Sequence, residues 1–374
     1  MKTDLKITYF FQKGRINRID SSVPYAKEMF YGYHYFQSKY KHTKIVEFRN
    51  HEKKWHKILF FFEKKLRNAL KLPLYWSFIT SLKNFKIIRN SNILVLTNNR
   101  VGCAVLPMVI FAKLFNKDLK SNCFIMGLFS RKPKYKFLEF FQKIYLKLFL
   151  TFTDNLIFLS EGEKNYAEVE YSSFAYKFHV IPFGVDRSIW RSKFCEKDID
   201  LLFVGNDGFR DYEFTSILIN NLSHYRITVV SNEINKSDTK IVNENCNILN
   251  GSWGSPEITD VQLAELYSRS KLTILPLKNS LQPSGQSVTL QSISCGTPVL
   301  ITKTPGFWDN KNFRDNKNIY FLQKNEVEKW KMQIDKILKK YEENTEFMNK
   351  NLENLIENYT LEKFNSKLEK LIIK

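Results

Sequence analysis

Short apolar runs alternate with longer amphipathic segments along most of this chain. The apolar runs have the length of buried strands, and the amphipathic segments repeat their apolar positions at helical spacing. Strands that alternate with helices in this way are typical of βαβ units and a parallel sheet. In the first half, the pattern predicts strands at 7–11, 44–48, 92–97, 123–128, 155–160 and 178–182, and helices at 25–40, 54–70, 102–115, 135–152 and 161–171.

The alternation stops in a polar, charged stretch at 187–198 and then starts again. Two successive open α/β units predict an α/β protein with two Rossmann-like domains facing a central cleft. We place the first domain at 1–186, the second at 187–355, and a C-terminal helix at 356–374 that returns to the first domain. The second half has predicted strands at 201–204, 227–231, 272–275 and 299–301, helices at 212–219 and 261–268, and an amphipathic tail at 325–374 whose last helix is 359–373.

Positive charge is concentrated in the first half of the chain. The net charge is +20, from 58 Lys and Arg against 38 Asp and Glu over 374 residues. Residues 1–190 hold 33 of the basic and 14 of the acidic residues, whereas the rest is almost neutral. A basic half implies an anionic partner, which can be a phospholipid, a lipid pyrophosphate or a nucleic acid.

The cysteines and the distribution of apolar residues indicate the cellular compartment of the protein. The five cysteines are scattered and form no paired motif, which is typical of a reduced, cytosolic protein. Residues 1–6 lack the apolar core of a signal peptide, and no run of about 18 apolar residues predicts a membrane span. These features predict a cytoplasmic protein.

The segment from Gln282 to Val299 carries the most specific chemistry. A Ser/Gly turn opens a short helix, the helix stops at Gly296, and Pro298 leads into an apolar strand. The N-terminus of such a helix presents free backbone N–H groups, and it is an anion site that a pyrophosphate fits. The residues that offer these groups are Gly285, Gln286, Ser287 and Val288.

This segment resembles the donor-binding signature of GT-B glycosyltransferases, particularly the retaining family-4 enzymes. The tail Ser294-Cys295-Gly296-Thr297-Pro298-Val299 fits the family pattern closely. Gln291 stands where the family has its second glutamate, whose usual role is to hold the nucleotide ribose, and an amide accepts the same hydrogen bond. Pro283 falls near the first glutamate, which usually contacts the donor sugar, so that Ser284 or Gln286 would share this role. The alternative is an ordinary βαβ crossover that ends at a glycine.

Two further motifs follow the family order. Residues 180–186 resemble the strand and turn Ile-Pro-Asn-Gly-Val-Asp, with Phe183 in place of Asn and with Gly184 for the tight turn. Residues 203–212 form a strand, a glycine loop and a helix start. In the resembling enzymes this loop brings a basic group to the donor phosphates, so that Asn206 and Arg210 are candidate donor contacts. The alternative for Arg210 is an ion pair with Asp211 or Glu213.

Other loop residues have weaker assignments. Lys13, Gly14 and Arg15 follow the first strand, where related enzymes place a loop against the donor diphosphate and the acceptor; a solvated basic loop is the alternative. Trp253 or Ser231 would lie near the nucleotide base.

No catalytic residue is assigned. Many family-4 enzymes have a histidine just after the fourth strand, and none of the six histidines falls there. A retaining reaction needs no protein base if a leaving-group phosphate oxygen takes the acceptor proton, whereas an inverting enzyme would use a carboxylate such as Asp20 or Glu28. Asp198-Ile199-Asp200 is interpreted as a charged linker, so no metal and no cofactor are expected.

Two predicted helices that are rich in basic and aromatic residues favour a membrane-bound acceptor. Residues 137–152 and 53–65 suit interfacial binding to an anionic membrane surface, although both can simply pack against a sheet. We therefore expect a glycosyltransferase, peripheral on the inner face of the cytoplasmic membrane. It would move a sugar from a UDP- or GDP-sugar to a glycan, most naturally a lipid-linked one, in bacterial surface polysaccharide or lipopolysaccharide synthesis. The reaction is expected to be retaining and metal-independent.

Three alternatives stay open. A sugar-nucleotide epimerase on the same fold would need no acceptor. A basic nucleic-acid-binding protein would use the Lys/Arg and aromatic mixture for stacking, although no RNA motif is present and no nucleic acid is expected. A degenerate GT-B scaffold would follow from the missing glutamates and histidine.

Overall fold

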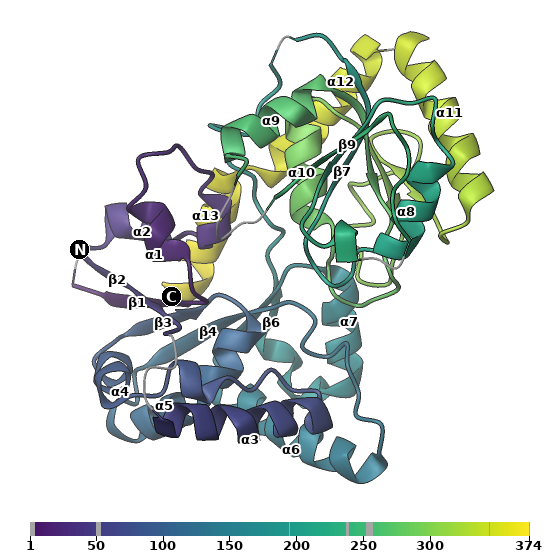
Figure 1. Ribbon diagram of the computed structural model, residues 1–374. Helices are drawn as coiled ribbons and strands as arrows, with labels where there is room; N and C mark the ends of the chain where they lie inside the picture. Colours follow the sequence, from purple (N-terminus) through teal and green to yellow (C-terminus); the bar gives the residue numbers. More distant parts are fainter. Residues whose placement is uncertain are drawn as a thin grey trace. The chain divides into compact units, whose positions relative to one another are not determined.

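The computed structural model describes residues 4–49, 54–193, 195–236, 239–251, 257–343 and 345–373, without the side chains of 54–56, 342–343 and 345–349. The chain divides into two compact units. Unit 1 comprises Met1–Ser21, Met29–Pro182 and Asn365–Lys374, and unit 2 comprises Ser22–Glu28 and Phe183–Phe364. Each unit is built on its own sheet (Figure 1).

Unit 1 contains a six-stranded sheet in the order β2-β1-β3-β4-β5-β6, and every strand pair in it is parallel. Its strands are β1 (Lys6–Phe11), β2 (His42–Glu47), β3 (Ile93–Leu96), β4 (Lys120–Ile125), β5 (Asn155–Phe158) and β6 (Phe178–Val180). Its helices are α1 (Arg15–Ile19), α2 (Tyr33–Lys39), α3 (Lys54–Leu70), α4 (Leu82–Arg89), α5 (Asn99–Phe115), α6 (Lys136–Phe152) and α7 (Glu161–Glu170), with 3-10 turns at Glu28–Phe30, Trp76–Phe78 and Ser172–Lys177.

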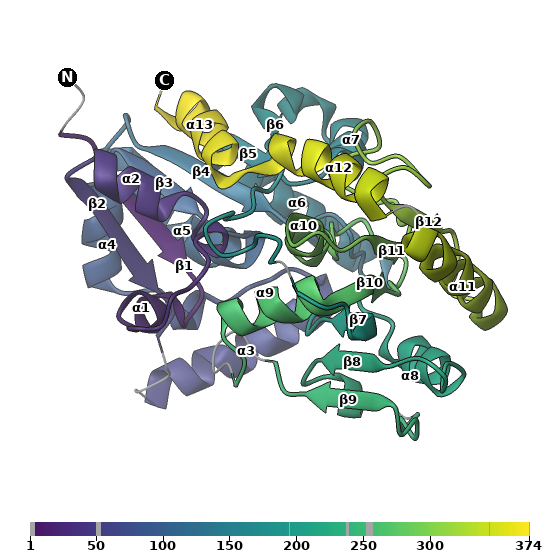
Figure 2. The same ribbon diagram turned by 90° about the horizontal axis from the view of Figure 1, so that it is seen from above.

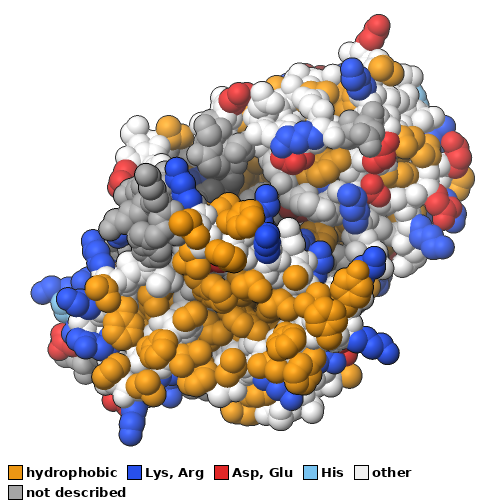
Figure 3. Space-filling view, turned by 60° about the horizontal axis from the view of Figure 1, so that its bottom comes forward, with side chains coloured by type: hydrophobic (Ala, Val, Ile, Leu, Met, Phe, Trp, Pro, Cys, Tyr) orange, Lys and Arg blue, Asp and Glu red, His pale blue; other side chains and the backbone are white. Residues whose placement is uncertain are grey.

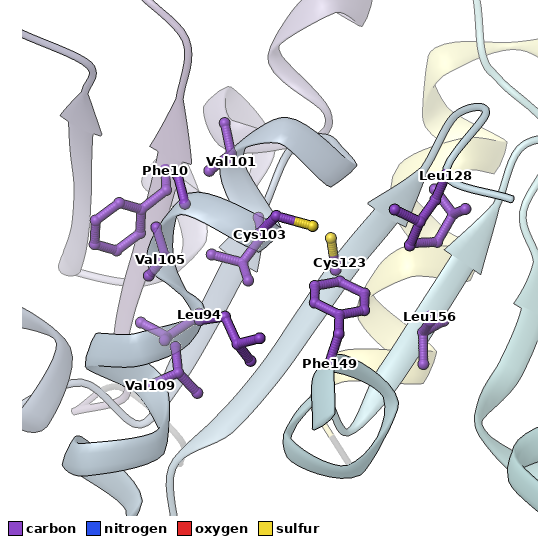
Figure 4. Packing of buried hydrophobic residues seen from close by; sticks show 14 of the residues in the cluster. Phe10, Leu94, Val101, Cys103, Val105, Val109, Cys123, Leu128, Phe149 and Leu156 are labelled. Carbon is purple, nitrogen blue, oxygen red and sulfur yellow. The ribbon is translucent and has the colours of Figure 1, made fainter. Parts of the chain in front are cut away.

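The central strand β3 is buried at every residue, which explains why it is continuously apolar. Successive side chains of a strand point to opposite faces. Phe10 packs in one buried cluster with residues of α5 and α6. In this cluster Cys103 of α5 and Cys123 of β4 point toward one another as free thiols (Figure 4). Tyr9 and Phe11 point the other way and make edge-to-face or tilted contacts with the rings of α2 and the preceding turn.

Unit 2 repeats the architecture with the strand order β12-β11-β10-β7-β8-β9, again all parallel. Helices α8 and α11 cover one face, and α9 and α10 cover the other (Figure 2). The strands are β7 (Ile199–Val204), β8 (Ile227–Val230), β9 (Cys246–Leu249), β10 (Ser270–Leu275), β11 (Val299–Thr302) and β12 (Tyr320–Leu322). The helices are α8 (Tyr212–Asn220), α9 (Asp260–Arg269), α10 (Gln286–Ser294), α11 (Val327–Glu343) and α12 (Thr345–Ile356), with 3-10 turns at Ile234–Lys236 and Glu357–Tyr359. Helix α13 (Leu361–Ile372) begins in unit 2 and continues into unit 1.

The predicted α/β class is confirmed, and most predicted elements lie within a few residues of their observed bounds. Two differences are larger. The helix expected at 25–40 is a 3-10 turn followed by the shorter α2, and β4 begins and ends three residues before the predicted 123–128. The sequence analysis also missed α1, α4, β9 and β12. The domain boundaries at 186 and 355 stay predictions.

Gly184 lies where the chain makes a close approach inside unit 2. Its backbone contacts the start of α13: Val185 pairs with Thr360, and Leu361 N donates to Val185 O at 3.0 Å. A Cβ on Gly184 would meet Phe364 Cβ at 2.7 Å and Thr360 O at 2.9 Å. The glycine is therefore required by steric contact with the C-terminal segment, and not only by the turn that the sequence suggested.

We expect Gly184→Ala to lower the free energy of unfolding by about 1–3 kcal/mol, because overpacking against backbone forces the neighbouring segment to move. Gly208→Ala is the matched control, since a Cβ there meets no atom within 4 Å. Urea unfolding of the two variants and the wild type measures both effects. Equal stability of the two variants would contradict the steric role of Gly184.

Candidate functional site

The carboxyl ends of β7 and β10 form the topological switch point of unit 2. Chain connections leave these two neighbouring strands toward opposite edges of the sheet, and ligands bind at such points in open α/β sheets. The loop after β7 and the loop after β10 are joined by backbone hydrogen bonds. Lys278 N donates to Phe209 O at 2.9 Å, and Asp211 N donates to Pro276 O at 3.0 Å. The two predicted donor loops therefore lie side by side.

The loop after β10 ends at the N-terminus of α10. Gly285 is the N-cap residue in a left-handed conformation (φ 84°), and no side chain caps the helix. Two hydroxyl oxygens near this terminus, Ser284 Oγ and Thr289 Oγ1, are buried and have no hydrogen-bond partner among the described residues. A buried polar group without a partner is uncommon and demands an explanation. A helix N-terminus with an orphaned hydroxyl beside it suits an anionic ligand with oxygen acceptors.

The opposite end of α10 is held by a half-buried lysine. Lys197 Nζ donates to Ser270 O at 2.8 Å and to Thr297 Oγ1 at 3.0 Å, and it lies 3.5 Å from Gly296 O. Burial lowers the pKa of this ammonium group to about 8. A cation at the C-terminus stabilises the helix dipole, so Lys197 fixes α10 at this end.

Gly306 holds the loop at 280–285, which precedes α10, in position. Gly306 N donates to Ser280 O at 2.9 Å. A Cβ on Gly306 would meet the backbone of Leu281 at 2.4 Å and Gln282 O at 2.6 Å. The sequence analysis missed this residue, and its only signal was a glycine shortly after β11.

Arg210, the predicted phosphate contact, is almost completely buried, with 2% of its surface exposed. Its side chain packs over Gly205, and its Nη1 donates to Asp207 Oδ2 at 2.8 Å. The sequence analysis considered Asp211 and Glu213 as ion-pair partners of Arg210. Asp211 instead caps α8, and Glu213 accepts a hydrogen bond from Thr239 N. The Asp207 pair orients the guanidinium in the loop, and a phosphate contact by Arg210 stays a prediction.

Asn206 ties the ends of three neighbouring strands together. Its Nδ2 donates to Gly251 O after β9, and its Oδ1 accepts from Asn232 N at 2.7 Å after β8. The Ser231 hydroxyl lies in the same network, 3.4 Å from Asn206 Oδ1. Trp253, the other candidate neighbour of the base, lies outside the described residues.

Gln291 points to a buried carboxyl group that the chain brings from far away. Its Nε2 donates to Glu28 Oε1 at 3.0 Å, and Trp190 Nε1 donates to the same oxygen at 2.6 Å. Glu28 and Trp190 are each 1% exposed, and Glu28 Oε2 has no hydrogen-bond partner among the described residues. The sequence analysis considered Glu28 only as a catalytic base. No feature of the sequence near Glu28 predicts its contact with Gln291. Trp190 was expected in a linker and is instead part of the core.

Two carboxylates bind residues 22–28 to the rest of unit 2. Ala26 N donates to Asp260 Oδ2 at 2.7 Å, and Lys27 N donates to Asp186 Oδ2 at 3.0 Å. Asp186 ends the motif at 180–186, so this motif positions Glu28 as well as the start of unit 2. Burial raises the pKa of Glu28 to about 7, and the negative charge of Asp186 adds to the rise.

In unit 1, the predicted diphosphate loop already binds a carboxylate. The Glu47 side chain accepts hydrogen bonds from the backbone N–H groups of Gly14, Arg15 and Ile16, the last at 2.8 Å. Gly14 is left-handed (φ 107°) and opens α1. The loop therefore has the geometry of an anion site, and a diphosphate would have to displace Glu47 to use these three groups.

The turn after β4, where the resembling family has a histidine, is held by Glu163. This carboxyl group accepts from Gly127 N at 2.8 Å, and burial raises its pKa to about 7. Among the described side chains, no histidine lies in this turn. His179, for example, lies in β6 and contacts Asn155.

The acidic pair of the predicted linker is neutralised by basic side chains. Asp198 pairs with Arg269 at 2.5 Å, and Asp200 pairs with Lys271 at 3.0 Å. Asp200 lies inside β7, so that only Asp198 belongs to the linker. Within the described part of the chain, no group of three or more His, Cys, Asp or Glu side chains has an arrangement that could hold a metal.

The raised pKa of Glu28 leads to a prediction about stability. Because the folded state holds this proton up to about pH 7 and the unfolded state only to about 4.5, stability falls as the pH rises between these values. Glu28→Gln removes this contribution, so its stability relative to the wild type should rise by up to roughly 3 kcal/mol from pH 4 to pH 8. Denaturant unfolding at several pH values measures the difference, with the exposed Glu244→Gln as control. Parallel pH profiles of Glu28→Gln and the wild type would refute the assignment.

Part of the chain matches a known family. Residues 231–363 match the model described as "Glycosyl transferases group 1". This range contains α10, the loop before it, Gln291 and Gly306. No curated protein matches the chain.

Solved structures with the same fold cover nearly the whole chain. Sucrose-phosphate synthase from Thermosynechococcus elongatus has a TM-score of 0.66 at 11% identity, with 98% of each chain covered. A glycosyltransferase from Rickettsia africae has a TM-score of 0.66 at 13% identity, with 99% of this chain and 98% of that one covered. Anabaena HepE in complex with UDP has a TM-score of 0.66 at 12% identity, with 98% and 99% covered. The two parallel six-stranded sheets are therefore a GT-B fold. The chain thus shares this fold over nearly its whole length, and its residues 231–363 are similar to group 1 glycosyl transferases.

Proposed function

We propose that the protein transfers a sugar from a UDP-sugar to a lipid-linked glycan in the synthesis of a bacterial surface polysaccharide. The observation that carries the donor assignment is the uncapped N-terminus of α10 beside the orphaned Ser284 hydroxyl, at the switch point of unit 2. UDP is preferred to GDP because the similar Anabaena protein was solved with UDP and with UDP-glucose.

In this proposal, the diphosphate lies at the start of α10. The N–H groups of Gln286, Ser287 and Val288 stabilise the negative charge that develops on the leaving diphosphate, and Ser284 donates its hydroxyl to the ligand. Arg210 adds positive charge from the neighbouring loop. Gln291, with Glu28 behind it, lies on the same helix, and the ribose hydroxyls are the ligand groups that this pair suits.

The reaction that best suits these residues is retaining and metal-independent. Positioning of the two substrates and stabilisation of the leaving group supply the rate enhancement, and a phosphate oxygen takes the acceptor proton. The basic character of residues 1–190 supports an anionic acceptor such as a lipid diphosphate. A lipid-linked acceptor places the enzyme at the inner face of the cytoplasmic membrane. No helix within the described residues has the length and apolar character to cross a bilayer.

Calorimetric titration with UDP, GDP, ADP and CMP tests the donor site. We expect selective UDP binding, and Ser284→Ala should weaken it about tenfold, since a hydrogen bond to a charged group contributes about 1.5–3 kcal/mol. Ser130→Ala, in unit 1, is the control for loss of a hydroxyl. Failure of all four nucleotides to bind would rule out the donor site. UDP-sugar turnover without any added acceptor would favour the epimerase alternative.

The loop contact at Gly306 leads to a separate prediction. Gly306→Ala should push the loop at 280–285 away from its position, so that UDP affinity falls at least tenfold while the protein stays folded. Calorimetry and circular dichroism on the same sample separate the two effects. Undiminished UDP affinity in a folded Gly306→Ala protein would show that the loop does not contact the nucleotide.

A further inference from the structure

Helix α6 of unit 1 is apolar on two sides. Its inner side is buried through Gln142, Leu146, Phe149 and Leu150. A second stripe at helical spacing points to solvent, and its members are Phe137, Phe140, Phe141, Ile144 and Leu148. A helix that only packs against its sheet would expose polar side chains here. The packing alternative from the sequence therefore accounts for one side of α6 and leaves the other unexplained.

Helix α3 lies against α6 and extends this surface. Its exposed apolar side chains are Ile58, Phe61, Phe62 and Leu66. We call these nine residues of α3 and α6 the outer apolar face. Figure 3 shows hydrophobic side chains gathered over the side of the molecule that carries α3 and α6, with Lys and Arg side chains around them.

The outer apolar face is larger than ordinary exposed patches. Its five phenylalanines are each 54–62% exposed. A phenylalanine buries about 150–250 Å² when fully covered, so each of these rings leaves roughly 100 Å² in water and the five leave roughly 500 Å². The four aliphatic side chains add to this area. Patches beyond a few hundred Å² mark sites of contact with a protein or a membrane.

The charges around this face are almost entirely positive. Among the side chains of the two helices that the structure describes, the exposed lysines are Lys57, Lys64, Lys65, Lys136, Lys143 and Lys147. The helices contain two acidic residues, and neither opposes an anionic surface. Glu63 is fully buried and accepts two hydrogen bonds from Ser77 at 2.6 Å, and Glu139 is paired with Lys143 at 3.2 Å.

We propose that the outer apolar face docks on a bilayer that contains anionic phospholipid, with the phenylalanines in the interfacial layer and the lysines at the headgroups. Aromatic and aliphatic side chains with a lysine border are what an interfacial helix presents to such a membrane. Lysine stems extend along the apolar surface while their ammonium groups stay in the polar layer, as Lys65 does when its Nζ lies 4.5 Å from the Phe61 ring centre.

Charge distinguishes the membrane from a second copy of the chain. A two-fold dimer places the same patch against itself, so this face would bring two lysine borders together in a low-dielectric interface. Anionic lipid headgroups neutralise the same lysines. The inference deepens the proposed function by naming how the enzyme reaches its acceptor, and it rests on that function only for the lipid-linked acceptor.

Co-sedimentation of the full chain with vesicles tests the proposal. The vesicles are pure phosphatidylcholine, or phosphatidylcholine with one third phosphatidylglycerol, each at low and moderate salt. We expect binding to the anionic vesicles that salt weakens without abolishing. The triple variant Phe137→Ser, Phe140→Ser, Phe141→Ser should bind at least tenfold more weakly. The control variant Val169→Ser, Val242→Ser, Met332→Ser removes three exposed apolar side chains from α7, from the loop before β9 and from α11, and it should bind as the wild type does.

A second variant tests the charge border. Replacement of Lys57, Lys64, Lys136 and Lys147 by Gln should remove the preference for anionic vesicles. Vesicle binding that the phenylalanine variant leaves unchanged would overturn the proposal, as would an absence of binding to either vesicle. Sedimentation velocity gives the remaining test, because dimerisation abolished by the same phenylalanine variant would assign the face to a second copy. UDP affinity of the phenylalanine variant should equal that of the wild type, so that failure of docking and failure of the donor assignment are distinguishable.

Discussion

Backbone hydrogen bonds between two loops of unit 2 are the constraint on which the candidate donor site depends. The pairing of Lys278 with Phe209 and of Asp211 with Pro276 joins the loops that follow β10 and β7. Asn325 reinforces this junction, because its Nδ2 donates both to Leu277 O at 3.1 Å and to Asp211 Oδ2 at 2.8 Å. The start of α10 is thereby fixed relative to the loop that carries Arg210. Electrostatic stabilisation by a helix N-terminus requires such pre-organisation, because donors that must first reorient contribute less.

The amide at position 291 has a physical reason in this chain. Gln291 donates a hydrogen bond to Glu28, which is itself completely buried. A glutamate at 291 would place a second carboxyl group 3 Å from the first with little access to water, and two such groups cannot both ionise at low cost. In the proposed donor site, the amide at 291 would thus act together with a carboxyl group from a different part of the chain. The pair keeps one carboxyl and one amide at the place where the pattern has a single carboxylate.

Much of the fold could be predicted, because the period of the apolar positions is set by packing on both faces of a parallel sheet. The buried strands β3, β7 and β11 and the long helices α3 and α6 are examples. The elements that were missed carry a weak periodic signal. Strand β9 lies at the edge of its sheet with its side chains only partly buried, and α1 is a five-residue helix without a buried side chain.

The candidate site was predictable only where it follows from local sequence. The glycine turn before α10 and its left-handed conformation at Gly285 could be expected from the residues themselves. Contacts across long sequence separations could not. Glu28 reaches Gln291 over 263 positions, and Gly306 is required by the backbone of the loop at 281–282. The occupation of the predicted diphosphate loop by Glu47 likewise depends on the pairing of β1 with β2.

Helix α6 shows why composition alone could not decide between packing and surface contact. Sequence gives the positions that are apolar, but the sheet of unit 1 covers only one side of any helix packed on it. An apolar stripe on the remaining side keeps 43–62% of its surface in water, so it contributes less to the stability of unit 1 than a fully buried stripe would. The lysines at Lys136, Lys143 and Lys147 interrupt this stripe without covering it. Burial of Glu63 removes a negative charge from the surface of the neighbouring helix. The same arrangement that leaves the phenylalanines in water thus also leaves the surface around them positive, and both properties follow from which side of each helix the sheet covers.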